Sequence, residues 1–191
     1  MANPNKQSVY TVSIDLPDDG LGTLQDSDVS AQQDLLTVAE ASGFTRTSLH
    51  TDVLEFVSEL QALSPNFRVE TMAVSAEGRP LPLIILGDPV PTSPLDLSYD
   101  DRAVVYIQAN IHAGEVEGKE ATQMLARDLL SGELSATILE NVIVLICPIV
   151  NPDGNEKFST ENRTRQNGPV NGVGVRYNGQ YLDMNRDAAK L

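Results

Sequence analysis

The sequence has little cysteine, little histidine and no long apolar segment. Its single cysteine, Cys147, cannot form a disulfide within the chain, and its apolar neighbours predict a buried thiol. The longest apolar run, about nine residues, is too short to cross a bilayer. The N-terminus also lacks the apolar stretch of a secretory signal, which favours a cytoplasmic location.

Positive charge is scarce as well. The chain has 13 Lys and Arg against 27 Asp and Glu, a formal net charge of −14. The acidic residues are spread along the chain rather than gathered in a tail, which indicates a strongly solvated surface. Because such a surface repels nucleic acid and anionic membranes, we exclude both as partners.

What remains is ordinary for a globular protein. The 191 residues, 41% of them hydrophobic, are enough for one domain with a substantial core. Apolar spacing predicts strands at residues 8–16, 68–75, 81–86, 103–108 and 142–150, and helices at residues 52–63 and 117–130, with another helix that begins near Ser30 and ends at Gly43.

The order of these elements predicts an α/β fold. The turn at Glu77-Gly-Arg-Pro joins two of the strands into a hairpin. The strands at 103–108 and 142–150 are almost continuously apolar and flank a helix, which is typical of a βαβ unit. We therefore expect a mixed, largely parallel sheet with helices on both faces, and we expect Ala121, Met124, Leu125 and Leu129 of the second helix to face the core.

Polar motifs follow the two apolar strands at their carboxyl ends, where open α/β sheets bind ligands. His112-Ala-Gly-Glu115 follows the first and Asn151-Pro-Asp-Gly154 the second. An imidazole and a carboxylate three residues apart can bind one metal ion, and catalytic zinc commonly takes two His, one carboxylate and a water. A third cluster, Arg176 to Arg186, offers cations suited to a carboxylate or an oxyanion. Together the motifs predict a metal-dependent hydrolase.

In type and order these motifs resemble those of the zinc carboxypeptidase family, which carries His-x-x-Glu, Asn-Pro-Asp-Gly and then Asp-x-Asn-Arg, here Asp183-Met-Asn-Arg186. The Glu77-Gly-Arg79 turn resembles the family's Glu-Gly-Arg. The resemblance covers roughly residue 39 to the end. We therefore expect residues 1–38 to be an N-terminal extension and residues 39–191 the N-terminal portion of a carboxypeptidase-like domain, incomplete at its C-terminus.

The resemblance implies a role for each matching residue. Zinc would be the cofactor, with His112 and Glu115 as two of its ligands. Asn185 and Arg186 would bind the terminal carboxylate of the substrate. A further arginine would polarise the scissile carbonyl; Arg176 is favoured, and Arg165 is the alternative. Asp183 would orient its loop, while Asn151 and Asp153 would shape their turn.

The family also implies parts that this sequence does not supply, namely a third zinc ligand and a general-base glutamate after the Asn-Arg pair. The other histidine, His50, is expected at a helix start or on the surface rather than on the metal. We therefore expect an inactive portion of the enzyme, whose uncovered sheet edge would promote self-association.

Three functions stay open. The first is a metallocarboxypeptidase acting on peptides, which Asn-Pro-Asp-Gly and the Glu-Gly-Arg hairpin favour. The second is a zinc-dependent deacylase of small N-acyl amino acids, or a peptidoglycan amidase, on the same fold. The third is a non-catalytic interaction module that keeps the first part of the fold.

Overall fold

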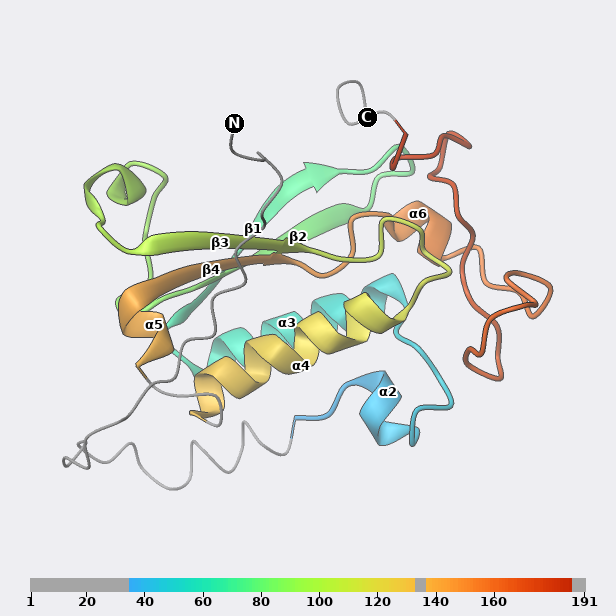
Figure 1. Ribbon diagram of the computed structural model, residues 1–191, viewed down its shortest axis with the longest axis horizontal. Coiled ribbons are helices and arrows are strands. Elements are labelled where there is room, and N and C mark those ends of the chain that lie inside the picture. The colour runs from blue at the N-terminus through green and yellow to red at the C-terminus, as the bar shows by residue number, and fades with distance from the viewer. Residues whose placement is uncertain (1–34, 133–136, 187–191) are drawn as a thin grey trace, which may run out of the picture.

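The computed structural model describes residues 35–132 and 137–186 (Figure 1). The strand predicted at residues 8–16 and the helix start predicted near Ser30 lie outside these residues. The elements are α2 (Val38–Ala41), α3 (His50–Leu63), β1 (Phe67–Val74), β2 (Pro80–Leu86), η1 (Asp96–Tyr99), β3 (Ala103–Gln108), α4 (Glu117–Ser131), α5 (Ile138–Asn141), β4 (Val142–Cys147) and α6 (Pro152–Asn155). Within the described residues, no helix combines the length and apolarity needed to cross a membrane.

The four strands form one mixed sheet in the order β1-β2-β4-β3. β1 and β2 form the predicted antiparallel hairpin, and β3 and β4 lie parallel on either side of α4 in the chain. The α/β class and the βαβ unit are therefore confirmed. Parallel pairing is less extensive than expected, because β4 separates β2 from β3 and runs antiparallel to β2. Among the described strands, only the β3–β4 pair is parallel.

Both long helices cover the same face of the sheet (Figure 1). Alternate residues of β2 and β4 turn toward the helices and form one core with them, made of Val53, Phe56, Val57, Leu60, Ala126, Leu129, Ile84, Leu86, Val144 and Ile146. The prediction of helices on both faces is thus not met in the described part of the chain. On the opposite face, Leu83, Ile85 and Leu145 line a groove with Pro91, Pro94 and Leu97 of the loop that contains η1.

Local signals account for the bounds of several elements. Thr37 and Glu40 form a reciprocal capping box on α2, and Gly43 follows it with a φ of +62°. The Asp52 carboxylate accepts the backbone N–H of Leu49 at the start of α3. β4 stops at Cys147, shorter than predicted, because Pro148 has no N–H to continue the ladder.

One predicted side-chain position on α4 is wrong, and the predictions for His50 and Cys147 are confirmed. On α4, Ala121 is exposed, whereas Lys119 and Gln123 are fully buried. His50 begins α3 as expected but is buried, and its Nε2 lies 2.7 Å from the carbonyl oxygen of Pro80. Cys147 is buried as predicted, and desolvation raises the pKa of its thiol to about 11.

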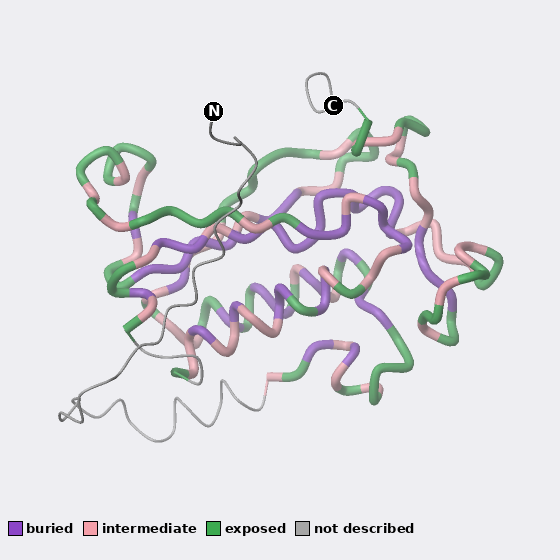
Figure 2. Tube along the Cα trace, in the orientation of Figure 1, coloured by how far each residue is buried: buried purple, intermediate pink, exposed green. Residues whose placement is uncertain are grey.

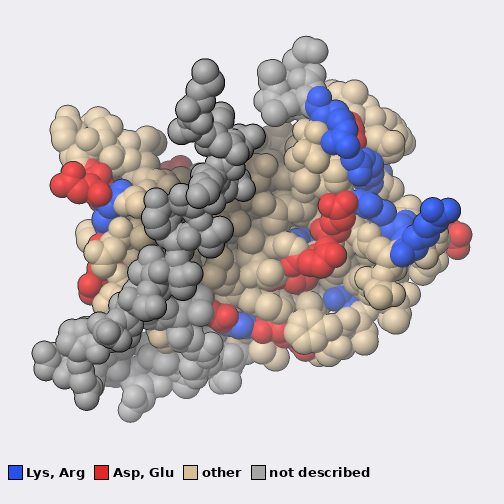
Figure 3. Space-filling model, viewed as in Figure 1, with Lys and Arg blue, Asp and Glu red and all other residues tan. Residues whose placement is uncertain are grey.

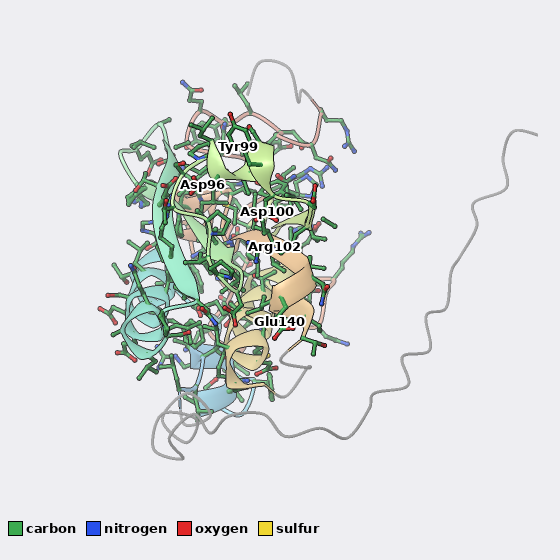
Figure 4. All side chains as sticks on the ribbon, turned by 90° about the vertical axis from the view of Figure 1, so that its left-hand side faces the viewer. Asp96, Tyr99, Asp100, Arg102 and Glu140 are labelled. Atoms are coloured by element: carbon green, nitrogen blue, oxygen red, sulfur yellow. The ribbon has the colours of Figure 1, made fainter. Side chains whose placement is uncertain are left out.

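The loop from β2 to β3 is closed by Arg102 at one end of the sheet. Its guanidinium donates to the carboxylate of Asp100 at 2.7 Å and to the carbonyl oxygens of Pro89 and Leu139. Figure 4 views this end of the molecule and shows Asp100 and Arg102 between η1 and Glu140 of α5. Hydrogen bonds from Arg102 hold the pKa of Asp100 at about 2. The predicted site residues lie at the other end of the strands.

Candidate metal centre

The turn that carries His112 and Glu115 is held by backbone and side-chain hydrogen bonds. Asn110 adopts a φ of +65°, which asparagine tolerates better than most residues, and its amide donates to the carbonyl oxygens of Ala113 and Glu115. The N–H of Glu115 closes the turn on the carbonyl oxygen of His112 at 2.8 Å. The sequence immediately after β3 therefore forms a defined His-x-x-Glu turn that leads into α4.

The two predicted zinc ligands face each other in this turn. His112 Nδ1 lies 3.2 Å from Glu115 Oε1, and His112 Nε2 lies 3.1 Å from Asp183 Oδ1. An Nε2–H that donates to Asp183 leaves the lone pair of neutral imidazole on Nδ1, on the side of Glu115. A carboxylate behind a metal-binding histidine commonly fixes its tautomer and ring orientation in this way. The arrangement thus matches two donors of one metal site, with Asp183 as their support.

Arg176 lies at the same place. Its Nε donates to Asp183 Oδ2 at 2.7 Å, and its Nη1 lies 3.4 Å from His112 Nδ1. Burial opposes ionisation of Asp183, but hydrogen bonds from Arg176 and His112 outweigh it and lower the pKa of Asp183 to about 2. Asp183 therefore orients both the His112 imidazole and the Arg176 guanidinium. Arg165, the alternative to Arg176, is exposed.

Asn185 and Arg186 follow directly after Asp183 and are exposed. The backbone N–H of Asn185 donates to Asp183 Oδ1 at 3.0 Å, and that of Arg186 to the carbonyl oxygen of Asp183 at 3.0 Å. In the described conformation, neither side chain hydrogen-bonds to His112 or Glu115. The structure therefore brings His112, Glu115 and Arg176 together and leaves the other two predicted site residues at the rim.

The sequence analysis missed Arg163. Its Nη2 lies 2.5 Å from Glu115 Oε1, so a second guanidinium reaches the predicted ligand pair. Burial raises the pKa of Glu115, but the hydrogen bonds and charges of Arg163 and His112 together outweigh it, and the net shift is downward. The sequence spacing between Arg163 and the turn carries no signal of this contact. Gly114 is the one hint, because a side chain there would collide with the stem of Arg163.

The Asn-Pro-Asp-Gly motif connects the parts of the site. Asn151 caps α6 by accepting the N–H of Gly154, and its amide donates to the carbonyl oxygens of Ile111 and Arg176. It therefore links the turn after β3 to the segment that carries Arg176.

Asp153 connects the same motif to the β1–β2 hairpin. Its buried carboxylate accepts Ser75 Oγ at 2.7 Å, the N–H of Glu77 at 3.1 Å and Arg79 Nη1 at 2.7 Å. This is the Glu-Gly-Arg turn that the sequence singled out, so two distant motifs meet through one carboxylate.

Arg163 and Arg176 bring positive charge to the site of an otherwise acidic protein. Figure 3 shows Lys and Arg side chains gathered over the C-terminal loops, with Asp and Glu beside them. Within the described residues, no group of three His, Cys, Asp or Glu side chains is arranged to hold a metal ion. The donors present fit zinc in chemical type and in orientation, but they supply two protein ligands rather than three.

An α/β sheet with a carboxylate-supported His-x-x-Glu turn at the carboxyl end of a strand, next to two arginines, is an arrangement that suits metal-dependent hydrolysis. The family model described as zinc carboxypeptidase matches residues 53–189, and the chain belongs to this family.

Individual relatives agree with this assignment. The chain is 24% identical over 156 residues to carboxypeptidase B of Helicoverpa zea, an alignment that covers 73% of this chain and 35% of that protein. A metallo-carboxypeptidase from Burkholderia cenocepacia has the same fold, with a TM-score of 0.52, 24% identity, and coverage of 72% and 32%. Carboxypeptidase A from Helicoverpa armigera gives a TM-score of 0.50 at 22% identity, covering 67% and 32%. The chain spans about a third of the length of these relatives.

Proposed function

We propose that this chain contributes the His112 and Glu115 ligands to the zinc site of a metallocarboxypeptidase that removes the C-terminal residue of a peptide. The observation that carries the proposal is the pairing of His112 Nε2 with Asp183, which turns Nδ1 toward Glu115. Membership of the zinc carboxypeptidase family supports the cofactor and the reaction class.

The proposal gives a role to each of the five residues. His112 and Glu115 would hold the metal, which when bound supplies an activated water and polarises a carbonyl. Arg176, fixed by Asp183, would donate to the negative charge that develops on the scissile carbonyl oxygen. Asn185 and Arg186 would bind the terminal carboxylate of the substrate, a planar anion that suits guanidinium and amide donors.

Zinc binding by these residues alone is expected to be weak. The sequence has two histidines, and His50 is held against Pro80 in another part of the fold. A site with two protein ligands lacks the third that catalytic zinc commonly has. We therefore expect the purified 191-residue chain to lose zinc during dialysis and to release no C-terminal residues from a panel of peptides and N-acyl amino acids.

Metal analysis after dialysis against zinc-free buffer checks this expectation, with His112→Ala as the matched control. Stoichiometric zinc retained by the wild-type chain and lost by H112A would show that a third ligand is present after all. Hydrolysis of N-acyl amino acids but not of peptides would favour the deacylase alternative.

We also propose that the chain associates with itself through the outer edge of β3. Val104, Val105 and Tyr106 are 48%, 43% and 47% exposed, and Figure 2 shows β3 exposed along most of its length beside the buried β4. Long uncharged edges of this kind pair readily with other strands. The opposite edge is guarded, because β1 carries Arg68 and Glu70 and an irregularity in its register.

Val104→Lys is expected to reduce this association. A charge on the edge strand must be desolvated or repelled when two copies pair. Sedimentation velocity over a concentration series measures the effect, with Val74→Lys as the control, because Val74 is 63% exposed at the end of the guarded strand. We expect V104K to be monomeric at concentrations where wild type and V74K are dimeric; a monomeric wild type would contradict the proposal.

A further inference from the structure

An uncommon backbone conformation and the hydrogen bonds of a neighbouring residue hold Arg163 in place. Its φ is +54°, a left-handed conformation that is uncommon for residues other than glycine and asparagine. The neighbouring Asn162 amide anchors the loop by donating to the carbonyl oxygens of Lys157 at 2.8 Å and Val173 at 2.9 Å. Backbone conformations of this kind persist where surrounding contacts enforce them, and they gather at functional sites.

The turn that carries the ligands accommodates the stem of Arg163. A Cβ at position 114 would lie 2.8 Å from Arg163 Cγ, 2.8 Å from the carbonyl oxygen of Gly174 and 3.0 Å from Arg163 Nε, so glycine at this position makes room for both the Gly174 backbone and the Arg163 side chain. Gln166, three residues after Arg163, donates to the carbonyl oxygen of Gly114 and ties the two loops together. Arg163 Nε is buried without a hydrogen-bond partner. The side chain is thus directed across the His-x-x-Glu turn.

The Arg163 guanidinium faces Glu115, the predicted metal ligand. Arg163 Nη2 lies 2.5 Å from Glu115 Oε1, the same oxygen that lies 3.2 Å from His112 Nδ1. A zinc ion bound by Oε1 and Nδ1 would occupy the space beside this oxygen and carry a like charge. Two cations a few ångströms apart repel each other even where water screens them partly.

We infer that Arg163 is a latch on Glu115, a guanidinium that competes with zinc for the carboxylate and lowers the zinc affinity of the site. This inference rests on the proposed role of Glu115 as a ligand. The latch can open because the Arg163 side chain is 27% exposed and Glu115 is 45% exposed, so the ion pair is of the weak, solvent-accessible kind. Its unpartnered Nε favours leaving the turn, since that nitrogen gains a water there.

The test compares zinc affinities of matched variants by calorimetric titration with zinc chloride. Arg163→Asn removes the charge and retains a residue that tolerates positive φ. Arg46→Asn removes the same charge from an exposed residue outside the proposed site. We expect R163N to bind zinc about tenfold more tightly than wild type, from the lost competition and repulsion, and R46N to stay within about twofold.

Three further variants keep the result interpretable. Arg163→Lys preserves the positive charge and should bind zinc no more than about threefold more tightly than wild type, while Arg163→Gln repeats the charge removal should R163N fold poorly. Equal zinc affinity of wild type, R163N and R163Q, or weaker binding by the two neutral variants, overturns the latch. His112→Ala in the R163N background distinguishes failure of the proposed metal site from failure of the latch. If H112A leaves the zinc affinity unchanged, the proposed metal site is wrong. If H112A abolishes zinc binding but R163N binds zinc no more tightly than wild type, only the latch is wrong.

Discussion

Asp153→Ala should lower the free energy of unfolding by about 3 kcal/mol, the largest stability loss that we expect from a single change near the site. The Asp153 side chain is 2% exposed and accepts hydrogen bonds from Ser75 Oγ, the backbone of Glu77 and Arg79. Removing it leaves the Ser75 hydroxyl and the Glu77 N–H without this acceptor. Arg79 keeps Glu77 as a partner at 2.7 Å, which limits the loss.

Urea unfolding monitored by circular dichroism measures this change. Asp101→Ala, at an exposed position, is the control and should alter the free energy of unfolding by less than about 0.5 kcal/mol. Asp153→Asn retains the shape but not the charge and should fall between the two. If D153A is as stable as D101A, Asp153 does not join the hairpin to α6 in solution.

The second large effect concerns pH and the buried Lys119. Its side chain is fully buried and donates to the carbonyl oxygen of Ser48 and to Asn155 Oδ1. Desolvation lowers the pKa of Lys119 from 10.5 to about 8, although the nearby carboxylates of Glu120 and Glu156 oppose the shift. Burying this ammonium ion therefore costs stability while the lysine is protonated in both states.

The direction of the pH dependence follows from that depression. Below pH 8 the folded and unfolded chains both carry the proton, so the cost is fully present. Between pH 8 and 10.5 the unfolded chain holds the proton more tightly, and stability rises with pH. The full gain is about 3 kcal/mol, from about 1.4 kcal/mol for each pKa unit.

Lys119→Met supplies the reference, since methionine does not titrate. The difference in unfolding free energy, wild type minus K119M, should rise by about 2 kcal/mol between pH 7.5 and 9.5. Measuring the difference cancels the tyrosines and other groups that titrate in both proteins. A difference that stays flat or falls across this range would show that Lys119 is not deprotonated early in the folded chain.

Much of the secondary structure near the site could be predicted from short-range patterns. The bounds of β3 match the apolar run at residues 103–108, and α4 matches the predicted helix to within one residue. Hydrophobic spacing places these elements because apolar residues recur with different periods in helices and in strands. The buried face of α4 was predicted in part. Leu129 is buried and Leu125 packs against the core as expected, but Ala121 is exposed. Lys119 and Gln123 are buried through contacts that a hydrophobic pattern does not encode.

The site, too, could be predicted only where neighbouring residues carry the signal. His112 and Glu115 could be found because their spacing of three residues in a turn is itself the chemical signal. The two details that define their environment depend on residues far along the chain. Asp183 is 71 residues from His112, and Arg163 is 48 residues from Glu115. The sequence predicts only an orienting role for Asp183 in its own loop and gives no indication that Arg163 reaches the site.

By itself, the sequence determined the α/β class, the hairpin, the βαβ unit and the order of the polar motifs. Turns, strands and metal-binding spacings depend on residues that are close together in the sequence. Only the tertiary structure decided that both long helices share one face, that Asp183 turns His112 Nδ1 toward Glu115, and that Arg163 reaches the same carboxylate. These features arise from the path of loops between distant segments, where hydrogen bonds and packing select one conformation among many that the local sequence allows.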